Sequence, residues 1–585
     1  MMHRPRAFFL HNDSFIRLGL AALAVVGLSC APLAAQTWQE LIDFSKLQQR
    51  LGTSMPTGAG GVISQVEAGQ GAGGAYYVDG AAAQFNGSLD PLGMPVTLTD
   101  GSAGAHKGVS AHASNLVGAR FFGDTESLAP GANDVVLYET SHWLNSVVKY
   151  NSSSPPDAQN FRVQNHSWVG TMATGDPAPL PFIEHPNNVK VLERFDYMIE
   201  TANSGMGMTA VVGLNNNTGP LPYLLAHSYN AIGVGRTDGI HSSGLTLAPD
   251  ATPPNSSYGP GRSKPDIVAP LSTTSAATAA VSSAAAFLYD AVDGTAASHN
   301  EVIKSLLMAG ATKNEFPSWS RTATQPLHET FGVGELNIYN SYLIQLGGQH
   351  SGTIAAPATT AGSYGWDYQD HKNNSSIGDI FYNFEIPEGS TAEELSIVLA
   401  WNARITDTDP NGGFAPALSL QNLDLKFYDS TGGFRASMID QSISAVDNVE
   451  HLYFTGLDPG TYTLAVTGAA GWDFGLGWRT KTKFDQISAD FDGDGVVNGG
   501  DFLRWQLNAG TLIGASASDG DADGDGDVDA EDLSAWRAGL IAISPPSFAA
   551  SVGAIPEPAG AVLAAISVVS LLCIRRARRL AKYAR

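Results

Sequence analysis

Apolar and polar residues alternate with different periods in different parts of the chain. Between residues 60 and 345, short apolar runs are separated by segments whose apolar residues recur at helical spacing. Such runs predict buried strands, and alternating strands and helices form a mostly parallel sheet with helices on both faces. The predicted strands are 62–66, 135–138, 163–168, 209–213, 231–238 and 266–269, and the clearest predicted helices are 195–202 and 276–288. This region therefore predicts an α/β fold, whose ligands lie at the carboxyl ends of the strands.

Residues 351–482 follow a period of two instead. Apolar and polar residues alternate in short runs such as 396–401, 423–428 and 461–466, and turns rich in Gly, Asp and Pro separate the runs. This pattern predicts an antiparallel β-sandwich. The sequence of this region contains no cluster of catalytic residue types, so we expect an accessory role in stability or binding.

Both ends of the chain contain apolar segments flanked by basic residues. Three arginines precede an apolar run at 18–28, which predicts a secretory signal peptide over residues 1–35. Near the other end, a linker at 541–558 is followed by sixteen apolar or small residues and then by six lysines and arginines. A run of that length can cross a thin bilayer with its basic end in the cytoplasm, so 559–585 is a predicted membrane segment.

The composition of the chain limits which classes of partner it can bind and which interactions can stabilise it. The 585-residue chain has a net charge of −24, which repels phosphate backbones and excludes nucleic acid as a partner. Its length predicts about two to four domains, and its 43% hydrophobic content supports large packed cores. The two cysteines, Cys30 and Cys573, lie in the terminal apolar segments. The exported part would therefore lack disulfides and depend on core packing and metal.

Two acidic repeats of identical spacing follow the predicted sandwich, at 490–501 and 521–532. Calcium takes about six to eight oxygen ligands, which loop positions 1, 3, 5, 7, 9 and 12 supply in loops of this length. The residues at these positions are Asp490, Asp492, Asp494, Val496, Asn498 and Asp501 in the first repeat, and Asp521, Asp523, Asp525, Asp527, Asp529 and Asp532 in the second. Val496 and Asp527 would contribute backbone carbonyls. Each loop leads into an amphipathic segment, so 490–540 predicts a Ca²⁺-dependent module.

Two C-terminal features resemble known modules. Each repeat is a calcium loop with aspartate as its last ligand, followed by a helix. Two such units resemble a dockerin-type module, which implies a cohesin-like or other protein partner. Pro-Glu-Pro at 556–558, an apolar segment and an arginine cluster together resemble PEP-type C-terminal sorting signals of bacterial envelope proteins. That resemblance implies recognition by a membrane sorting enzyme, with removal of the tail or an uncleaved membrane anchor as the two outcomes.

The stretch 263–288 carries the candidate chemistry. A strand-like run ends at Pro270, small hydroxyl residues follow, and an Ala-rich segment from residue 276 predicts a buried helix. Ser275 therefore lies where a loop becomes a helix, and the free N–H groups of the helix start can stabilise negative charge there. Locally, the same residues also fit a hydroxyl residue that caps a packing helix.

KPDIVAP followed by TTSAATAAVSSAAAFL resembles the nucleophile segment of subtilisin-like serine proteases. The resemblance places Ser275 on the catalytic serine, while Thr273 replaces the family's glycine and Ala279 replaces its proline. The family's α/β fold, a mostly parallel sheet with helices on both faces, is expected over 36–350. Residues 351–482 are similar to the jelly-roll domains that follow many secreted proteases.

Two further segments resemble the base and acid segments of this family. GVSAHASNLVGARFFG resembles the histidine segment, with His112 on the catalytic histidine and His106 as the competitor. The first predicted strand ends in Glu67-Ala-Gly where the family has Asp-x-Gly, so Glu67 is implied as the acid that orients the imidazole, with Asp79 as its rival. The resemblance also implies that the Ser275 hydroxyl lies within about 3 Å of a His112 ring nitrogen, or somewhat further without substrate.

The strand at 209–213 and the asparagine-rich turn after it resemble the oxyanion-hole segment of the same family. Asn217 falls on the asparagine that donates to the developing oxyanion, an effect worth roughly 3 kcal/mol in such enzymes. Asn216 is the alternative donor, and an asparagine run is also ordinary turn chemistry. Acid, histidine, asparagine and serine follow one another in the order of this family.

These resemblances imply an exported serine endopeptidase that hydrolyses a protein or peptide substrate through an acyl-enzyme. Its implied catalytic residues are Glu67, His112, Asn217 and Ser275. Thr273, Ala279 and Glu67 depart from the family pattern. They motivate the alternative, a non-catalytic envelope scaffold with a calcium-dependent interaction module.

Overall fold

The computed structural model describes residues 36–542 apart from short internal stretches. These stretches are 90–92, 103–107, 173–185, 223, 246–261, 291, 293–294, 356–357, 359 and 485–486. The predicted signal peptide, the linker beyond residue 542, the segment 559–585 and His106 lie outside the described residues. Within the described ranges, no helix has the length and apolar character needed to span a bilayer.

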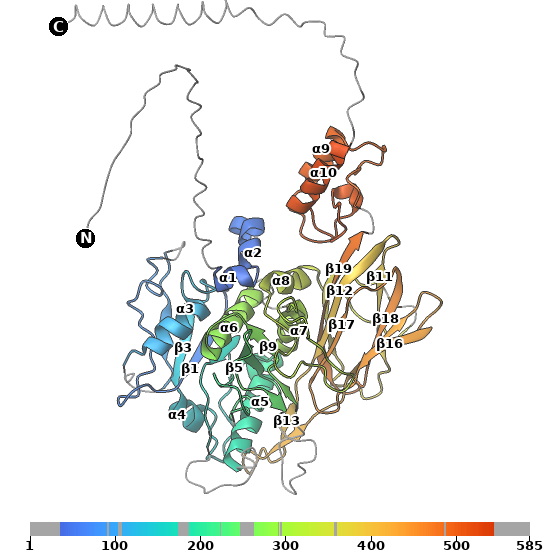
Figure 1. Cartoon of the computed structure of the whole chain (residues 1–585). Helices are drawn as coiled ribbons and strands as arrows, with labels where there is room; N and C mark the ends of the chain where they lie inside the picture. The colour runs from blue at the N-terminus through green and yellow to red at the C-terminus, as the bar shows by residue number, and fades with distance from the viewer. Residues whose placement is uncertain are drawn as a thin grey trace, which may run out of the picture.

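A seven-stranded parallel sheet lies at the centre of the N-terminal region (Figure 1). In spatial order its strands are β2 (Thr97–Asp100), β3 (Asp134–Glu139), β1 (Ile63–Glu67), β4 (Val163–His166), β5 (Thr209–Gly213), β6 (Ile232–Arg236) and β9 (Ile267–Ala269). Every neighbouring pair is parallel, so all carboxyl ends lie at one edge. The apolar runs predict six of these strands. They miss β2 because its residues are exposed or half-buried and form no apolar run.

Helices cover both faces of the sheet, so the predicted α/β architecture is confirmed. On one face, α6 (Thr274–Asp290) and α3 (Ala119–Phe122) share an apolar core with strand residues such as Val163 and Val211. On the other face, α5 (Pro186–Gly205) and η3 (Trp143–Val147) enclose Val66, Ala210 and Val212. The central strands are therefore buried from both sides, which explains their continuous apolar runs.

The Ala-rich helix α6 is buried along its length. Every side chain from Ala276 to Tyr289 is buried. Its hydroxyl groups bond the surrounding protein: Ser282 Oγ donates to Asn165 Oδ1 at 3.0 Å, and Ser283 Oγ accepts from the Leu128 N–H at 2.8 Å. Small side chains thus allow close approach to the sheet, and their hydroxyls find partners inside the core.

The segment before β1 belongs to the folded domain. It forms α1 (Trp38–Leu41), α2 (Phe44–Leu51) and η1 (Gly52–Ser54). The ring of Phe44 packs edge-on against Phe287 of α6 with centroids 6.0 Å apart. The Asn337 side chain, at the start of α8 (Ile338–Leu346), donates to Asp43 Oδ2 at 2.6 Å. These contacts anchor α2 beside α6 and α8.

The C-terminal half contains two four-stranded antiparallel sheets (Figure 1). One has the order β10 (Tyr364–Asp370), β19 (Asp473–Phe484), β12 (Ser390–Ala400) and β17 (Val449–Phe454), and the other β11 (Ile380–Ile386), β18 (Gly460–Thr467), β15 (Asp424–Asp429) and β16 (Ser437–Ser442). Their facing sides share a core that includes Trp401, Phe427 and Trp478. This is the antiparallel sandwich that the period of two predicts.

Strand β19 packs directly on α7 (Asn300–Gly310) of the α/β region. A Cβ at Gly475 would lie 2.5 Å from the backbone of Glu301, so a larger residue there would have to push the strand away. Arg479 of the same strand donates through Nε to the carbonyl oxygen of Ala309 at 3.0 Å, near the end of α7. The sandwich is therefore packed against the α/β region.

Candidate active site

Glu67 and His112 are hydrogen-bonded at the carboxyl edge of the parallel sheet. Glu67 is the last residue of β1, and His112 is the first residue of the π-helical segment η2 (His112–Gly118). His112 Nδ1 lies 2.9 Å from Glu67 Oε2. The Glu67 side chain is 2% exposed and the His112 side chain 27% exposed. A buried carboxylate thus holds one nitrogen of an imidazole that solvent can reach.

The two groups change each other's proton affinity. The hydrogen bond to Glu67 raises the pKa of His112 above its ordinary value, although burial acts in the opposite direction. Burial raises the pKa of Glu67, and the hydrogen bonds from His112 and Gln65 oppose this rise. Because Glu67 occupies Nδ1, Nε2 is the nitrogen that can exchange a proton with a reacting group.

Of the two predicted acids, Glu67 is the one that contacts His112 within the described residues. Asp79 Oδ1 instead accepts from the backbone N–H of Ala81 at 3.2 Å, which closes a local turn. The acid has a second partner that the sequence resemblance does not predict: the Gln65 side chain donates to Glu67 Oε1 at 3.2 Å. Residues 65 and 67 share a face of β1, so the strand period of two contained a signal for this contact.

Ser275 lies in the first turn of α6. Thr273, which replaces the family's glycine, stabilises the helix start because its Oγ1 accepts from the N–H of Ala276 at 3.2 Å. The Ser275 hydroxyl donates to the carbonyl oxygen of Ser167 at 3.2 Å, and the Ser167 hydroxyl donates to the Ser275 carbonyl oxygen at 2.9 Å. This reciprocal pair joins the helix start to the end of β4. The sequence contains no evident signal for the role of Ser167.

Sheet register relates Ser275 to the Glu67–His112 pair. Val66 of β1 is paired with His166 of β4. The residues that follow them, Glu67 and Ser167, therefore lie side by side at adjacent strand ends, about 5 Å apart. Glu67, His112 and Ser275 therefore lie at the same edge of the sheet, where the strands have their carboxyl ends. In the described part of the chain, no hydrogen bond joins the Ser275 hydroxyl to the His112 ring. The contact expected at about 3 Å is therefore absent in this conformation.

Asn216, rather than Asn217, lies against the start of α6. Its Oδ1 accepts from the N–H of Thr274 at 2.7 Å and from the Thr274 hydroxyl at 3.1 Å. Neither the Asn216 Nδ2 group nor the N–H of Ser275 donates a hydrogen bond within the described residues. The exposed Asn217 side chain makes no hydrogen bond there either. Asn216 Nδ2 and the Ser275 N–H are thus donors still available near the hydroxyl.

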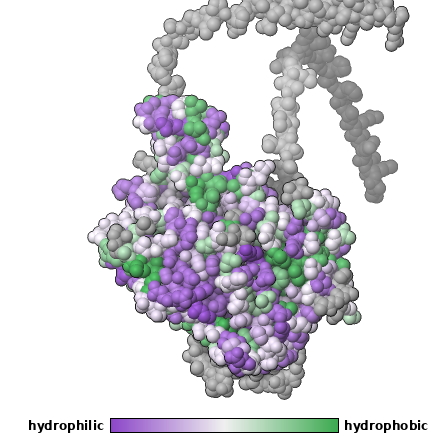
Figure 2. Space-filling view, turned by 180° about the vertical axis from the view of Figure 1, so that it is seen from behind, coloured by the Kyte–Doolittle hydropathy of each residue, from purple (hydrophilic) through white to green (hydrophobic). Residues whose placement is uncertain are grey.

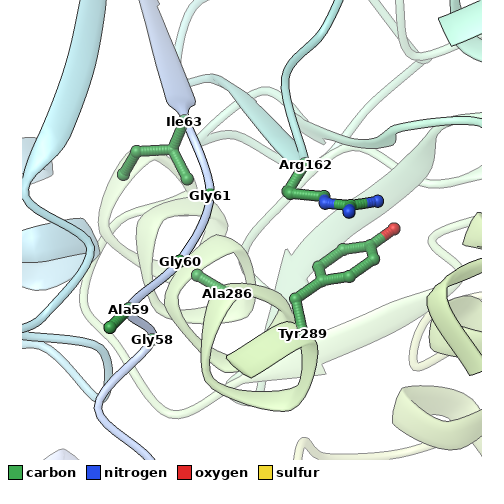
Figure 3. Close-up of a pocket in the computed structure, with 8 residues that line it drawn as sticks. All are labelled: Gly58, Ala59, Gly60, Gly61, Ile63, Arg162, Ala286 and Tyr289. Carbon is green, nitrogen blue, oxygen red and sulfur yellow. The ribbon is translucent and has the colours of Figure 1, made fainter. Parts of the chain in front are cut away.

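Two cavities lie at opposite edges of the sheet. One, of about 430 Å³, borders Arg236 at the end of β6, Glu315, and the loop Pro270–Leu271–Ser272 that leads to Ser275. The other, of about 10 Å³, lies where β1 begins and is lined by Gly58–Gly61, Ile63, Arg162, Ala286 and Tyr289 (Figure 3). Its size suits a single water molecule. Of these two cavities, the one of about 430 Å³ borders the loop that leads to Ser275.

Both acidic repeats form loops whose carboxylates converge. Oxygens from positions 1, 3 and 12 lie within 4.8 Å of one another, from Asp490, Asp492 and Asp501 in the first loop and from Asp521, Asp523 and Asp532 in the second. Gly495 and Gly526 have φ values of +85° and +87°, which L-residues rarely adopt. The loops lead into α9 (Gly499–Asn508) and α10 (Ala530–Ala542). This set of hard oxygen donors fits Ca²⁺.

The second loop is docked on the body of the protein, whereas the first is largely exposed. Arg50 of α2 donates to both carboxylate oxygens of Asp527, at 2.8 and 3.0 Å, and also pairs with Asp529. The Arg50 and Asp527 side chains are 10% and 8% exposed. Asp492 and Asp494 of the first loop are exposed. No local pattern in the sequence predicts the pairing of Arg50 with the second repeat, because 477 positions separate Arg50 from Asp527.

The chain matches no protein-family model and no curated protein. Among solved structures, it is similar to MycP1, a serine protease described as an essential component of the type VII (ESX-1) secretion system. That likeness has a TM-score of 0.29 at 14% identity and covers 54% of this chain and 90% of MycP1. For the pre-peptidase C-terminal domain of a Bacillus anthracis collagenase, the TM-score is 0.14 at 12% identity, over 21% of this chain and 91% of that domain. Likenesses this distant decide neither fold nor function.

Arg50→Ala should loosen the second acidic loop. The substitution leaves two carboxylates without their cation in a mostly buried setting, which typically costs about 3 kcal/mol or more. Hydrogen exchange of residues 521–532 in the calcium-free full chain should become at least tenfold faster. Arg435→Ala is the matched control, since Arg435 pairs with Asp379 at 3.4 Å where both side chains are more than a third exposed. Equal exchange in both variants would contradict the docking role of Arg50.

Proposed function

We propose that this chain is an exported serine endopeptidase acting through Ser275, His112 and Glu67. The observation that supports this function best is the Glu67–His112 hydrogen bond at 2.9 Å, formed at the same sheet edge as the start of α6. A buried carboxylate on Nδ1 orients the imidazole and stabilises its charged form, which is the task of the acid in a serine-protease triad. The exposed side of His112 leaves Nε2 available to a substrate.

In this proposal the Ser275 hydroxyl attacks the peptide carbonyl. Its proton passes to His112 Nε2, which later returns a proton to the leaving amine, and water then hydrolyses the acyl-enzyme by the same route. The Ser275 hydroxyl, which donates to the Ser167 carbonyl oxygen, would have to turn towards His112 for this step. Such catalytic contacts often tighten only when substrate is bound.

The donors beside Ser275 would stabilise the developing oxyanion. Asn216 Nδ2 and the Ser275 N–H are the proposed pair, because Asn216 is held against Thr274 by two hydrogen bonds. Asn217, which occupies the family's position by sequence, lies one residue further along the exposed turn. The cavity bordered by Arg236 and the loop before Ser275 would take a side chain of a protein or peptide substrate.

The alternative is a non-catalytic scaffold that retains this fold. The observation that favours it is the reciprocal Ser167–Ser275 hydrogen bonding, which uses the Ser275 hydroxyl without His112. In that case the Glu67–His112 pair would serve only the structure. Reactivity of the Ser275 hydroxyl separates the two functions, because a scaffold needs no activated serine.

The acidic repeats would add a calcium-dependent interaction module to the exported chain. Asp490, Asp492, Asp494, Asn498 and Asp501 would hold one Ca²⁺ and the matching residues of the second loop another, which would neutralise crowded carboxylates and stabilise the module. The repeats form a lobe beside the body (Figure 2), and Leu503 and Leu507 of α9 are 63% and 83% exposed. This exposed pair supports a protein partner, and the tail 559–585 would hold the chain at the membrane.

Ser275 should react with a fluorophosphonate probe in the purified full-length chain supplied with calcium. Labelling should be lost in Ser275→Ala and in His112→Ala, because the hydroxyl needs the imidazole for activation. Ser437→Ala is the control, since Ser437 is an exposed serine of the sandwich strand β16, and it should label normally. Absence of both labelling and peptide hydrolysis in the unchanged chain would favour the scaffold.

The activity should fall at acidic pH with a midpoint above about 6.5, the ordinary pKa of histidine. His112 acts as a base only when neutral, and its raised pKa keeps it protonated to a higher pH, so activity appears as the pH rises through that value. Glu67→Gln should lower the His112 pKa, measured by NMR of the ring, and reduce kcat by about 10⁴-fold. His142→Gln should change neither. An unshifted His112 titration in Glu67→Gln would refute the role of Glu67.

The full-length chain should bind two calcium ions in isothermal titration calorimetry. Asp490→Asn and Asp521→Asn should each remove one binding event, because each takes a charged first ligand from one loop. Asp134→Asn, a substitution of an exposed aspartate outside the repeats, should leave both events intact. Absence of binding heat at millimolar calcium would rule out the module as a calcium site.

A further inference from the structure

Gln65 lies between the two elements that carry the proposed acid and base. It is fully buried in the middle of β1. One hydrogen of its side-chain amide is donated to Glu67 Oε1 at 3.2 Å, and the other to the carbonyl oxygen of Ala113 at 3.0 Å. Ala113 directly follows His112 in η2. A single amide therefore links the carboxylate to the backbone next to the histidine.

The orientation of this amide follows from its neighbours. A carboxylate oxygen and a backbone carbonyl can only accept, so both must face the NH₂ group of Gln65. The opposite atom, Gln65 Oε1, is buried and has no hydrogen-bond partner within the described residues. A buried acceptor without a partner lowers stability. The Gln65 amide therefore makes two donated hydrogen bonds, while its own acceptor oxygen is left without a partner in the described part of the chain.

The amide matters because the acid is a glutamate. Glutamate has one more rotatable bond than the aspartate found at the family's position, and its terminal torsion is broad. The two oxygens of Glu67 have different partners, His112 on Oε2 and Gln65 on Oε1. Two bonds on opposite oxygens fix the plane of the carboxylate. Without Gln65, Oε1 would be buried with no donor in the described part of the chain, and the carboxylate could turn away from the imidazole.

We propose that Gln65 is a positioning residue that holds Glu67, and through it His112, in the orientation needed for proton transfer. This inference rests on the proposed peptidase function. It assigns no contact with substrate to Gln65, because the side chain is completely buried. Gln65 therefore acts on the turnover step and leaves substrate binding unchanged.

Gln65→Met tests this role because methionine has a similar length and donates no hydrogen bond. In the full-length chain, kcat should fall about 10-fold to 100-fold, the size of effect that a small misplacement of a catalytic group produces, while KM stays constant. The NMR titration of the His112 ring should move to lower pH, since its hydrogen bond to Glu67 weakens. Gln65→Asn keeps the amide but is too short to reach both acceptors, so it should show the same pattern if Gln65→Met does not fold.

Two comparisons distinguish positioning from a general loss of packing. Gln164→Met removes a buried glutamine of the neighbouring strand β4, bonded to His166 at 3.0 Å, and should leave the His112 titration unchanged. In a Glu67→Gln background, Gln65→Met should lower kcat little further, because both substitutions act through the same group. An unchanged His112 titration in Gln65→Met, or fully additive losses of kcat, would overturn the proposal. If the unchanged chain does not label at Ser275, the peptidase function fails, and the His112 titration still decides whether Gln65 orders the pair.

Discussion

Close packing of α6 on the parallel sheet is the constraint on which the candidate site depends. The helix is buried along its length, and its alanines let it lie close to the central strands. Its first turn then reaches the end of β4, where Ser275 and Ser167 exchange two hydrogen bonds. Bulkier side chains in the helix would push this turn outward, because a well-packed core absorbs added volume by shifting backbone. Residues without chemistry of their own therefore determine where the serine lies.

A second constraint is the burial of polar groups at the same edge. A buried carboxylate is expensive unless hydrogen bonds compensate it, and Glu67 has one bond on each oxygen. Its hydrogen-bond partners are the Gln65 amide and the His112 imidazole, which together orient the Glu67 carboxylate. This arrangement raises the proton affinity of His112 while leaving its outer nitrogen free for chemistry.

Arg50 neutralises part of the chain's negative charge at the second acidic loop. The second acidic loop brings several carboxylates to the body of the protein, and Arg50 of α2 meets two of them there. The same helix is anchored beside α6 through Phe44. The segment before β1 thus joins the sheet domain to the acidic module. The first loop has no such partner among the described residues and remains open to solvent, so the two repeats differ in setting although their spacing is identical.

Local patterns in the sequence determined the strand-and-helix order, the two regions of different period and the spacing of the acidic loops. These features depend on residues close together in the chain, which determine the spacing of apolar side chains along each element and the geometry of each turn. The family resemblance also predicted that Glu67, His112 and Ser275 share one sheet edge. Tertiary structure decided the rest: the edge strand β2, the choice of Asn216 over Asn217 beside Thr274, the bond from Gln65 to Ala113, and the docking of Arg50 on Asp527. Each of these depends on packing between segments far apart in the chain, and the direction in which a side chain finally points is settled only when those segments meet.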